Sequence, residues 1–211
     1  MKKISDFVSG IEKCTDAQIR EEMQKLTPAP VACVNWPDEF PYAPSVSVRV
    51  ANSENALVLM FEVAENHIKA VAMENNGNVW EDSCVEFFVA DPSGEGYYNF
   101  EVNCVGTVLA SKRKSRTDAV HFTDEQIAQM RVFGSLEHKP TDMRGEDLKW
   151  WLVEVIPFSL FGLEGGARTI KANFYKCGDN CDTTHFLSWS PIGLPSPDFH
   201  CPAFFGEIEL K

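Results

Sequence analysis

The sequence lacks a long apolar segment, and this absence excludes a membrane-spanning helix. Charged side chains interrupt residues 1–13 before any apolar stretch reaches the length found in the core of a signal peptide. These features predict a protein with no membrane partner and a cytoplasmic location. A secreted or periplasmic location is expected instead if a signal peptide precedes this sequence.

Basic residues are few relative to acidic ones. Lys and Arg total 19 against 31 Asp and Glu, which gives a formal net charge of −12. Such a charge repels phosphate backbones, so nucleic acid is not expected as a partner. The one basic cluster, residues 112–116, follows an expected strand and lacks interleaved aromatic residues. That pattern is typical of a solvated hairpin end.

Cysteine is too scarce for a fold built on disulfides. The seven cysteines are odd in number and show no small-scaffold spacing, which favours a reducing compartment. Cys177 and Cys181, with His185 nearby, suggest a metal site or a redox pair, but a second well-spaced Cys/His pair is missing. Only His200 and Cys201 are left over, so an ordinary loop is the simplest interpretation and no metal ligand is assigned.

The sequence also has no internal repeat and no low-complexity linker. Its 211 residues, 44% of them hydrophobic, suffice to bury a core as one domain. We expect a β domain over residues 36–211, preceded over residues 1–35 by a helix and an irregular lead-in segment. Within residues 15–26, apolar residues recur at spacings of four and three, which predicts a short amphipathic helix.

Apolar and polar residues alternate from residue 44 onward through most of the chain. This period of two predicts strands, and the strands are joined by loops rather than by repeated helices. The fold class predicted is therefore all-β, an antiparallel β-sandwich of jelly-roll or immunoglobulin-like type with a short N-terminal helix. Strands are expected near residues 44–50, 57–63, 83–90, 97–104, 106–112, 131–136, 149–156, 168–176 and 205–210.

The same alternation assigns side chains to the two faces of a sheet. In residues 83–90 the core face holds Val85, Phe87 and Val89, which leaves Glu86 pointing outward. Residues 97–104 and 169–175 sort in the same way. If the three strands share a sheet, its outward face collects Glu86, Glu101, Asn103, Lys171, Asn173 and Tyr175.

This collection of carboxylate, amide and basic groups fits a carbohydrate ligand. Sugars present hydroxyls at the ring edge and C–H groups on the ring faces, so their sites combine hydrogen-bonding groups with exposed aromatic rings. Trp80 and Trp189 stand at expected strand ends among polar or turn-forming residues, which predicts that they stack on the ligand. Trp150 and Trp151 are adjacent within an apolar strand, and at least one of them is expected in the core.

Residues 80–89, 97–103, 188–191 and 199–208 together resemble the family-9 carbohydrate-binding modules. The resemblance covers roughly residues 36–211 and extends to the wider group of domains similar to those of cellobiose dehydrogenase and dopamine hydroxylase. It implies a β-sandwich that holds a sugar between two tryptophans, here Trp80 and Trp189. It also implies hydrogen bonds from Glu86 and Asn173. Where sugar-binding members can carry an arginine, this sequence has Glu101.

Alternatives to sugar binding stay open. A structural or interaction domain would keep the sandwich without a sugar site, as the Glu101 position suggests. A haem-binding relative would use axial ligands such as Met60 and His67, although Met60 also suits packing. A glycosidase would use Glu86 and Glu101 as its two carboxyl groups.

The favoured hypothesis is a domain that is not an enzyme and binds a mono- or oligosaccharide. It needs no cofactor. Bound calcium is compatible with the acidic loops, but no spaced Asp-x-Asp-x-Asp loop is present. The expected ligand-binding residues are Trp80, Glu86, Glu101, Asn103, Lys171, Asn173, Tyr175 and Trp189.

Overall fold

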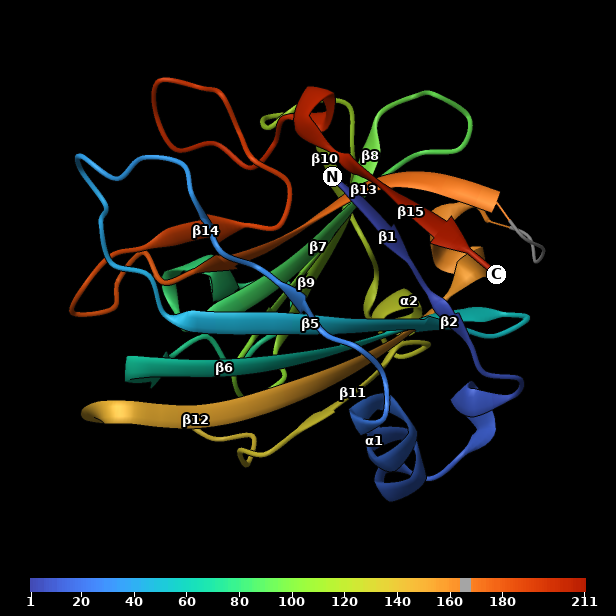
Figure 1. Ribbon diagram of the computed structural model, residues 1–211, viewed down its shortest axis with the longest axis horizontal. Helices are drawn as coiled ribbons and strands as arrows, with labels where there is room; N and C mark the ends of the chain where they lie inside the picture. Colours follow the sequence, from blue (N-terminus) through green and yellow to red (C-terminus); the bar gives the residue numbers. More distant parts are fainter. Residues whose placement is uncertain (164–167) are drawn as a thin grey trace.

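The computed structural model describes residues 1–163 and 168–211, and these form two stacked β-sheets with a short helix on one side (Figure 1). In the described residues, sheet A has nine strands and sheet B has six. Most neighbouring strands are antiparallel, while β1 runs parallel to β15 and β2 runs parallel to β5. The predicted β-sandwich with an N-terminal helix is confirmed.

Sheet A carries the face from which the candidate site is built. Its strands follow the order β1-β15-β13-β7-β8-β9-β10, and β14 pairs with both β13 and β4. Their bounds are β1 (Lys2–Ile4), β4 (Cys33–Val34), β7 (Cys84–Ala90), β8 (Tyr97–Asn103), β9 (Val108–Arg113), β10 (Ala119–His121), β13 (Arg168–Cys177), β14 (Phe186–Ser188) and β15 (Gly206–Leu210).

Sheet B follows the order β11-β12-β6-β5-β2, with β3 beside β5. The strand expected at residues 149–156 begins earlier, because residues 141–144 and 148 also pair with β6 although most of residues 141–148 are exposed. Because these residues are exposed on both faces, their sequence lacks the alternation of apolar and polar residues that would have predicted a strand. The bounds are β2 (Asp6–Phe7), β3 (Ala29–Pro30), β5 (Ser45–Asn52), β6 (Ala56–Ala70), β11 (Arg131–Gly134) and β12 (Thr141–Pro157).

The main core lies between the two sheets. Phe87 stacks on Phe100 and Phe174 at centroid distances of 6.1 and 5.5 Å, so the aromatic rings of β7, β8 and β13 form one layer. Val85 and Val89 join the same cluster, as the alternation predicted. Trp150 is also part of this core, whereas Trp151 is half-buried on the other face of sheet B.

Helix α1 (Asp16–Gln24) covers the outer face of sheet B. Thr15 begins it with a capping box, in which its hydroxyl accepts from the Gln18 amide and its own amide donates to the Gln18 side chain. Ile19 and Met23 are buried in a cluster with Met60. The remaining short helices are α2 (Asp124–Ile127), η1 (Ile11–Lys13), η2 (Val79–Glu81), η3 (Phe158–Phe161) and η4 (Pro202–Phe204).

The outer face of sheet A is largely covered, which corrects the expectation of an open face. Side chains of this face, including Cys84, Phe88 and Tyr175, form a second hydrophobic cluster. The cluster is closed by residues of two loop segments, 35–43 and 189–205, which contribute Trp36, Phe40, Ile192, Leu194, Phe199 and Phe204. Alternation identifies the face of a strand but does not reveal that a loop will pack over it.

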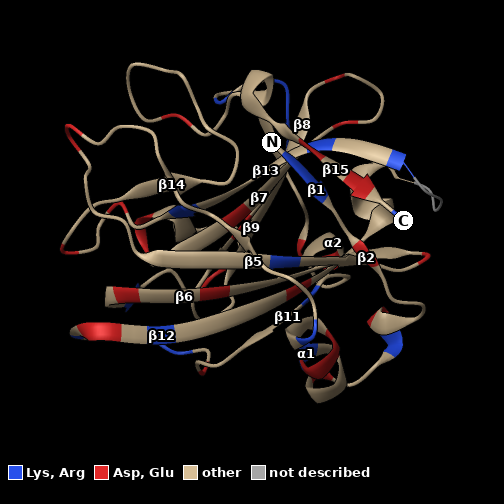
Figure 2. Ribbon diagram, viewed as in Figure 1, with Lys and Arg blue, Asp and Glu red and all other residues tan. Residues whose placement is uncertain are grey.

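Charges of both signs are interspersed along the ribbon (Figure 2). Several acidic and basic side chains pair across strands, as Lys171 does with Glu207 at 2.8 Å. The helices of the described residues are all too short or too polar to cross a membrane.

Candidate functional site

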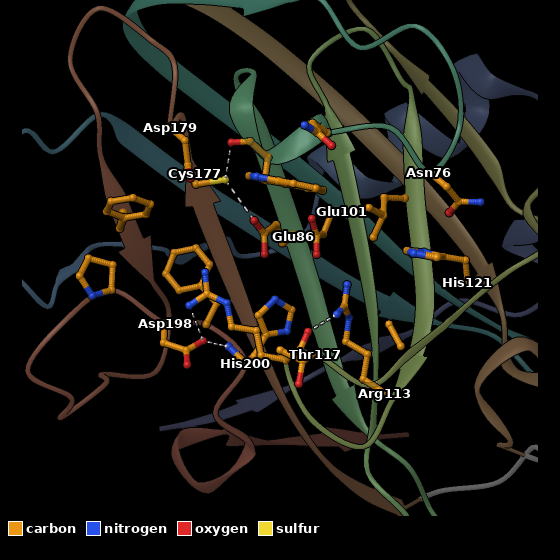
Figure 3. Close-up of a pocket in the computed structure, with 18 residues that line it drawn as sticks. Asn76, Glu86, Glu101, Arg113, Thr117, His121, Cys177, Asp179, Asp198 and His200 are labelled. Carbon is orange, nitrogen blue, oxygen red and sulfur yellow. Dashed lines mark hydrogen bonds and ion pairs between the residues drawn. The ribbon is translucent and has the colours of Figure 1, made fainter.

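A pocket of about 470 Å³ opens on the outer face of sheet A, beside the loops that cover the rest of that face (Figure 3). Its floor is formed by side chains from adjacent strands, with Glu86 on β7, Glu101 on β8 and Cys177 on β13. Loops and short elements supply the walls. Solvent therefore reaches the face predicted by alternation at this pocket.

Glu86 and Glu101 occupy directly opposite positions of β7 and β8, and both side chains point into the pocket (Figure 3). Each residue is only 3% exposed. Burial raises the pKa of Glu86 well above its usual value, and the neighbouring Glu101 carboxylate adds to the shift. Burial also raises the pKa of Glu101 to about 7, against the opposing effects of Asn99 and Arg113. Two carboxyl groups therefore share one poorly solvated floor.

Arg113 brings a guanidinium group into this pocket. Its Nε donates to Asn99 Oδ1 at 2.8 Å, and Asn99 Nδ2 donates to Glu101 Oε1 at 2.8 Å, so one amide positions both charged groups. The interpretation of residues 112–116 as a solvated hairpin end is wrong for Arg113, which is 9% exposed. Strand β9 continues one residue beyond its expected end, so Arg113 faces the same way as Leu109.

Aromatic side chains form one wall of the pocket. Trp80, from η2, is half-buried, and Phe186, Phe199 and His200 also line the pocket. His200 is held by a 2.9 Å hydrogen bond with the Tyr97 hydroxyl. Burial and the nearby Arg113 lower the pKa of His200 to about 4, so the ring is neutral at pH 7. Sequence reasoning missed all of these except Trp80, because Phe199 and His200 lie in a loop without a periodic pattern and Phe186 begins a strand of three residues, too short to show one.

The rim of the pocket is polar and carries acidic side chains. Asp179 and Asp198 lie at the rim with the exposed Arg116. Burial and the nearby Glu81 raise the pKa of Asp179 to about 6. Asn76, Asn78 and His121 complete the polar lining from the side of β9 and β10.

The structure places Trp189 in the core, which corrects its expected role as a stacking residue. Its side chain is 2% exposed and packs against Phe174 at a centroid distance of 5.6 Å. Gly206 leaves room for the indole, because a Cβ there would lie 2.5 Å from a ring carbon of Trp189. Trp189 is not among the residues that line the pocket.

Asn103 and Asn173 are buried and bound to backbone groups, so neither amide faces the pocket. Asn103 donates to the Ala72 carbonyl at 2.9 Å and accepts from the Thr107 amide at 2.9 Å, which closes the turn between β8 and β9. Asn173 donates to the Ser190 carbonyl at 3.0 Å and accepts from the Ser190 amide at 2.8 Å. Both expected ligand-binding amides instead hold loops in place.

Tyr175 and Lys171 also lie outside the lining of the pocket. Tyr175 is buried beneath the pocket wall, where its hydroxyl donates to the Phe199 carbonyl. Lys171 is exposed and forms its ion pair with Glu207 of β15. Of the eight residues expected to bind a ligand, the pocket therefore contains Trp80, Glu86 and Glu101.

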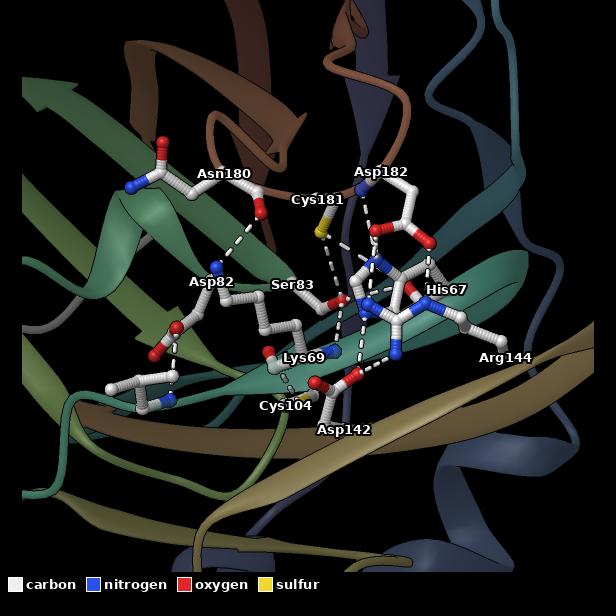
Figure 4. A network of polar contacts seen from close by, with 11 residues as sticks. His67, Lys69, Asp82, Ser83, Cys104, Asp142, Arg144, Asn180, Cys181 and Asp182 are labelled. Carbon is white, nitrogen blue, oxygen red and sulfur yellow. Dashed lines mark hydrogen bonds and ion pairs between the residues drawn. The ribbon is translucent and has the colours of Figure 1, made fainter.

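Three of the residues considered for haem or metal binding, Met60, His67 and His185, have other partners. Met60 is packed beneath α1, whereas His67 donates to Asp142 at 2.9 Å and accepts from the Asp182 amide at 2.8 Å (Figure 4). His185 takes part in a different contact, at 2.7 Å from Lys176 Nζ. Neither His67 nor His185 lines the pocket.

The comparisons with known proteins agree with the fold. The model of carbohydrate-binding family 9 matches residues 16–210. The comparison with curated proteins gives no match. Among solved structures, a candidate carbohydrate-binding protein from Bacteroides uniformis ATCC 8492 is 38% identical with a TM-score of 0.92, and the match covers 100% of this chain and 99% of that chain.

Two structures of a family-9 module from Caldicellulosiruptor kristjanssonii share the fold at low identity. The glucose complex is 12% identical, with a TM-score of 0.64 and coverage of 100% of this chain and 96% of that one. The cellotriose complex is 11% identical, with a TM-score of 0.67 and coverage of 100% and 94%. The match to the family model includes every residue that lines the pocket, and the chain belongs to carbohydrate-binding family 9.

Proposed function

We propose that the pocket binds a mono- or oligosaccharide, with a sugar ring against Trp80. The observation that carries this proposal is that a half-buried indole lines the same pocket as two buried carboxyl groups and a guanidinium group. The indole offers an apolar surface to the C–H face of the ring, while Glu86, Glu101 and Arg113 offer hydrogen bonds to its hydroxyls. A volume of about 470 Å³ lies within the usual range of small-molecule sites.

The complexes of the related modules suggest the first ligands to test. Those modules were solved with glucose and with cellotriose, so a hexose or a short chain of hexoses is the starting class. The pocket of this chain has its own wall, in which Phe186, Phe199 and His200 replace the second tryptophan that the resemblance implied. Its ligand therefore has to be identified by a screen of glycans.

The proposed activity is binding without catalysis. A glycosidase places its two carboxyl groups on either side of the scissile bond. Glu86 and Glu101 are instead cross-strand neighbours on one face of a single sheet, where opposite residues have Cβ atoms roughly 5 Å apart. Both carboxyl groups therefore approach a ligand from beneath, which suits hydrogen bonding to hydroxyls.

The test is a glycan-array screen followed by calorimetry with the best ligand. Trp80→Ala should weaken binding by about 10- to 100-fold, because it removes roughly 1.5–3 kcal/mol of apolar contact. Trp151→Ala is the matched control, since Trp151 lies on sheet B against Arg20, with the guanidinium 4.3 Å from the ring. No binding across the array, or unchanged affinity in Trp80→Ala, would overturn the proposal.

A further inference from the structure

Two cysteines and a glutamate converge at the floor of the pocket. Cys84 and Cys177 are directly opposite each other on β7 and β13, and Glu86 is two residues from Cys84 on the same face of β7. A sulfur or carboxylate oxygen from each of the three residues lies within 4.8 Å of the others. Among the described residues, this is the one cluster of three such potential metal ligands at that spacing.

The spacing within the cluster suits a small thiophilic ion. Cys177 Sγ is 3.0 Å from Glu86 Oε1, and in Figure 3 the two side chains point toward each other. Zinc binds sulfur at about 2.3 Å and carboxylate oxygen at about 2.1 Å, so tetrahedral ligands lie about 3.5–3.8 Å apart. The cluster needs only small side-chain rotations to reach those separations. Sulfur ligands favour zinc, cadmium or cobalt over calcium or magnesium.

The cluster is buried but has a route to solvent. Cys84 is fully buried, whereas Cys177 and Glu86 line the pocket. An ion held by the three side chains would have three protein ligands and a fourth position directed into the pocket. That arrangement is the one found in zinc sites that bind water or a substrate group at an open position.

The electrostatics of the pocket also favour a cation. Four carboxyl groups line it, those of Glu86, Glu101, Asp179 and Asp198, against the guanidinium groups of Arg113 and Arg116. Buried like charges on neighbouring strands repel each other, and a divalent ion at the floor reduces that repulsion.

We propose that Cys84, Glu86 and Cys177 bind one divalent ion of the zinc class at the floor of the pocket. Each thiol and the Glu86 carboxyl group release their protons to solvent as they bind the ion, so the three anionic ligands and the dication together carry a net charge of −1. The fourth ligand is water or a polar group of whatever occupies the pocket. This site does not depend on the pocket binding a sugar.

Cobalt(II) is the probe for the test, because cobalt bound to thiolates gives intense near-ultraviolet charge-transfer bands. The full chain is purified under a non-chelating reductant and titrated with cobalt, then with zinc. The wild type should develop the bands at one equivalent of cobalt and lose them when zinc displaces it. Cys177→Ser should abolish the bands and weaken zinc binding by more than about 100-fold, since loss of outer-shell partners alone costs 10- to 100-fold.

Control variants distinguish a specific metal site from adventitious binding of cobalt to other thiols and from misfolding. Cys201→Ser and Cys14→Ser remove half-buried thiols outside the cluster and should retain the bands. Glu86→Gln serves as the second cluster variant and should weaken cobalt binding. Because Cys177 and Glu86 are both buried, circular dichroism verifies the fold of each variant. The proposal is wrong if the wild type gives no bands at saturating cobalt, or if Cys177→Ser gives the same bands.

The two proposals for this pocket fail separately. Trp80→Ala should weaken sugar binding and keep the cobalt bands, because the hydrogen bond from Cys177 Sγ to Trp80, at 3.5 Å, is accepted by the backbone carbonyl, which the substitution retains. If the wild type binds sugar but not cobalt, only the proposed metal site is contradicted. If the wild type binds cobalt but no glycan, only the proposed sugar site is contradicted.

Discussion

The ring of Tyr175 lies 4.2 Å from the ring of Phe199, with 10° between the two planes. The Tyr175 hydroxyl also donates to the Phe199 carbonyl at 3.2 Å. Phe199 lines the pocket, and Tyr175 supports it from the sheet below. A residue that sequence analysis assigned to the ligand therefore positions the wall of the site instead.

Replacement of Tyr175 should affect stability and binding together. Tyr175→Phe removes one hydrogen bond and should lower the free energy of unfolding by about 1 kcal/mol. Tyr175→Leu also removes the stacked ring, so it should cost about 2–4 kcal/mol and weaken sugar binding by releasing Phe199. Urea denaturation and calorimetry measure the two effects. Equal sugar affinity in the wild type and Tyr175→Leu would show that the wall does not depend on this stack.

Trp189 and Trp80 should respond in opposite ways to truncation. Trp189→Ala removes a core side chain beside Gly206 and should destabilise the fold by about 3–5 kcal/mol. Trp80→Ala should change the free energy of unfolding far less, because its side chain is half-exposed. Thermal and urea unfolding of the two variants measure the difference. A Trp189→Ala protein as stable as the wild type would contradict the placement of Trp189 in the core.

Arg113 should contribute to sugar affinity through its charge and its fixed position. Arg113→Met keeps most of the buried aliphatic length but removes the hydrogen bond to Asn99 and the guanidinium group near Glu101. We expect affinity to fall by about 10-fold, in line with roughly 1.5 kcal/mol for a charged hydrogen bond. Calorimetry measures the change. Lys112→Met is the control, since Lys112 pairs with Asp91 outside the pocket lining, and equal losses in both variants would remove the assigned role.

Glu154 should make stability depend on pH. It is fully buried on β12, where Leu152 and Ile156 of the same face belong to the core, and both of its carboxyl oxygens lack a hydrogen-bond partner. Burial raises its pKa to about 8. The folded state therefore holds this proton more tightly than the unfolded state, whose glutamate has a pKa near 4.3. The contribution of Glu154 to the free energy of unfolding is fully present below the unfolded-state pKa and is lost as the pH rises toward 8.

Glu154→Met removes the ionisable group and should remove this loss. The free energy of unfolding of Glu154→Met minus that of the wild type should therefore increase by up to about 4 kcal/mol between pH 5 and pH 8. Urea denaturation at the two pH values measures the change. Glu146→Gln, an exposed change on the same strand, is the control. Parallel pH profiles for the wild type and Glu154→Met would contradict the expectation.

Alternation predicted the sheets well because burial of one face imposes it directly. Phe87 and Glu86 were assigned to opposite faces of β7, and the structure places them in the core and in the pocket. The same rule could not show that Tyr175 would be covered, because the covering loop has no periodic pattern. Arg113 was missed because a solvated hairpin end and a buried guanidinium share the same local sequence. Trp189 was misplaced because polar neighbours do not exclude a tryptophan from the core.

The pairing of β1 with β15 has a consequence for how the chain folds. Lys2, Lys3 and Ile4 align with residues 207–209, and Asp6 and Phe7 then continue into sheet B (Figure 1). Contacts between positions so distant in sequence raise the contact order, and high contact order slows folding. Because this short segment spans both layers, loss of its pairing would expose an edge of each. The β1 edge of sheet A therefore forms only when residues 2–4 meet residues 207–209.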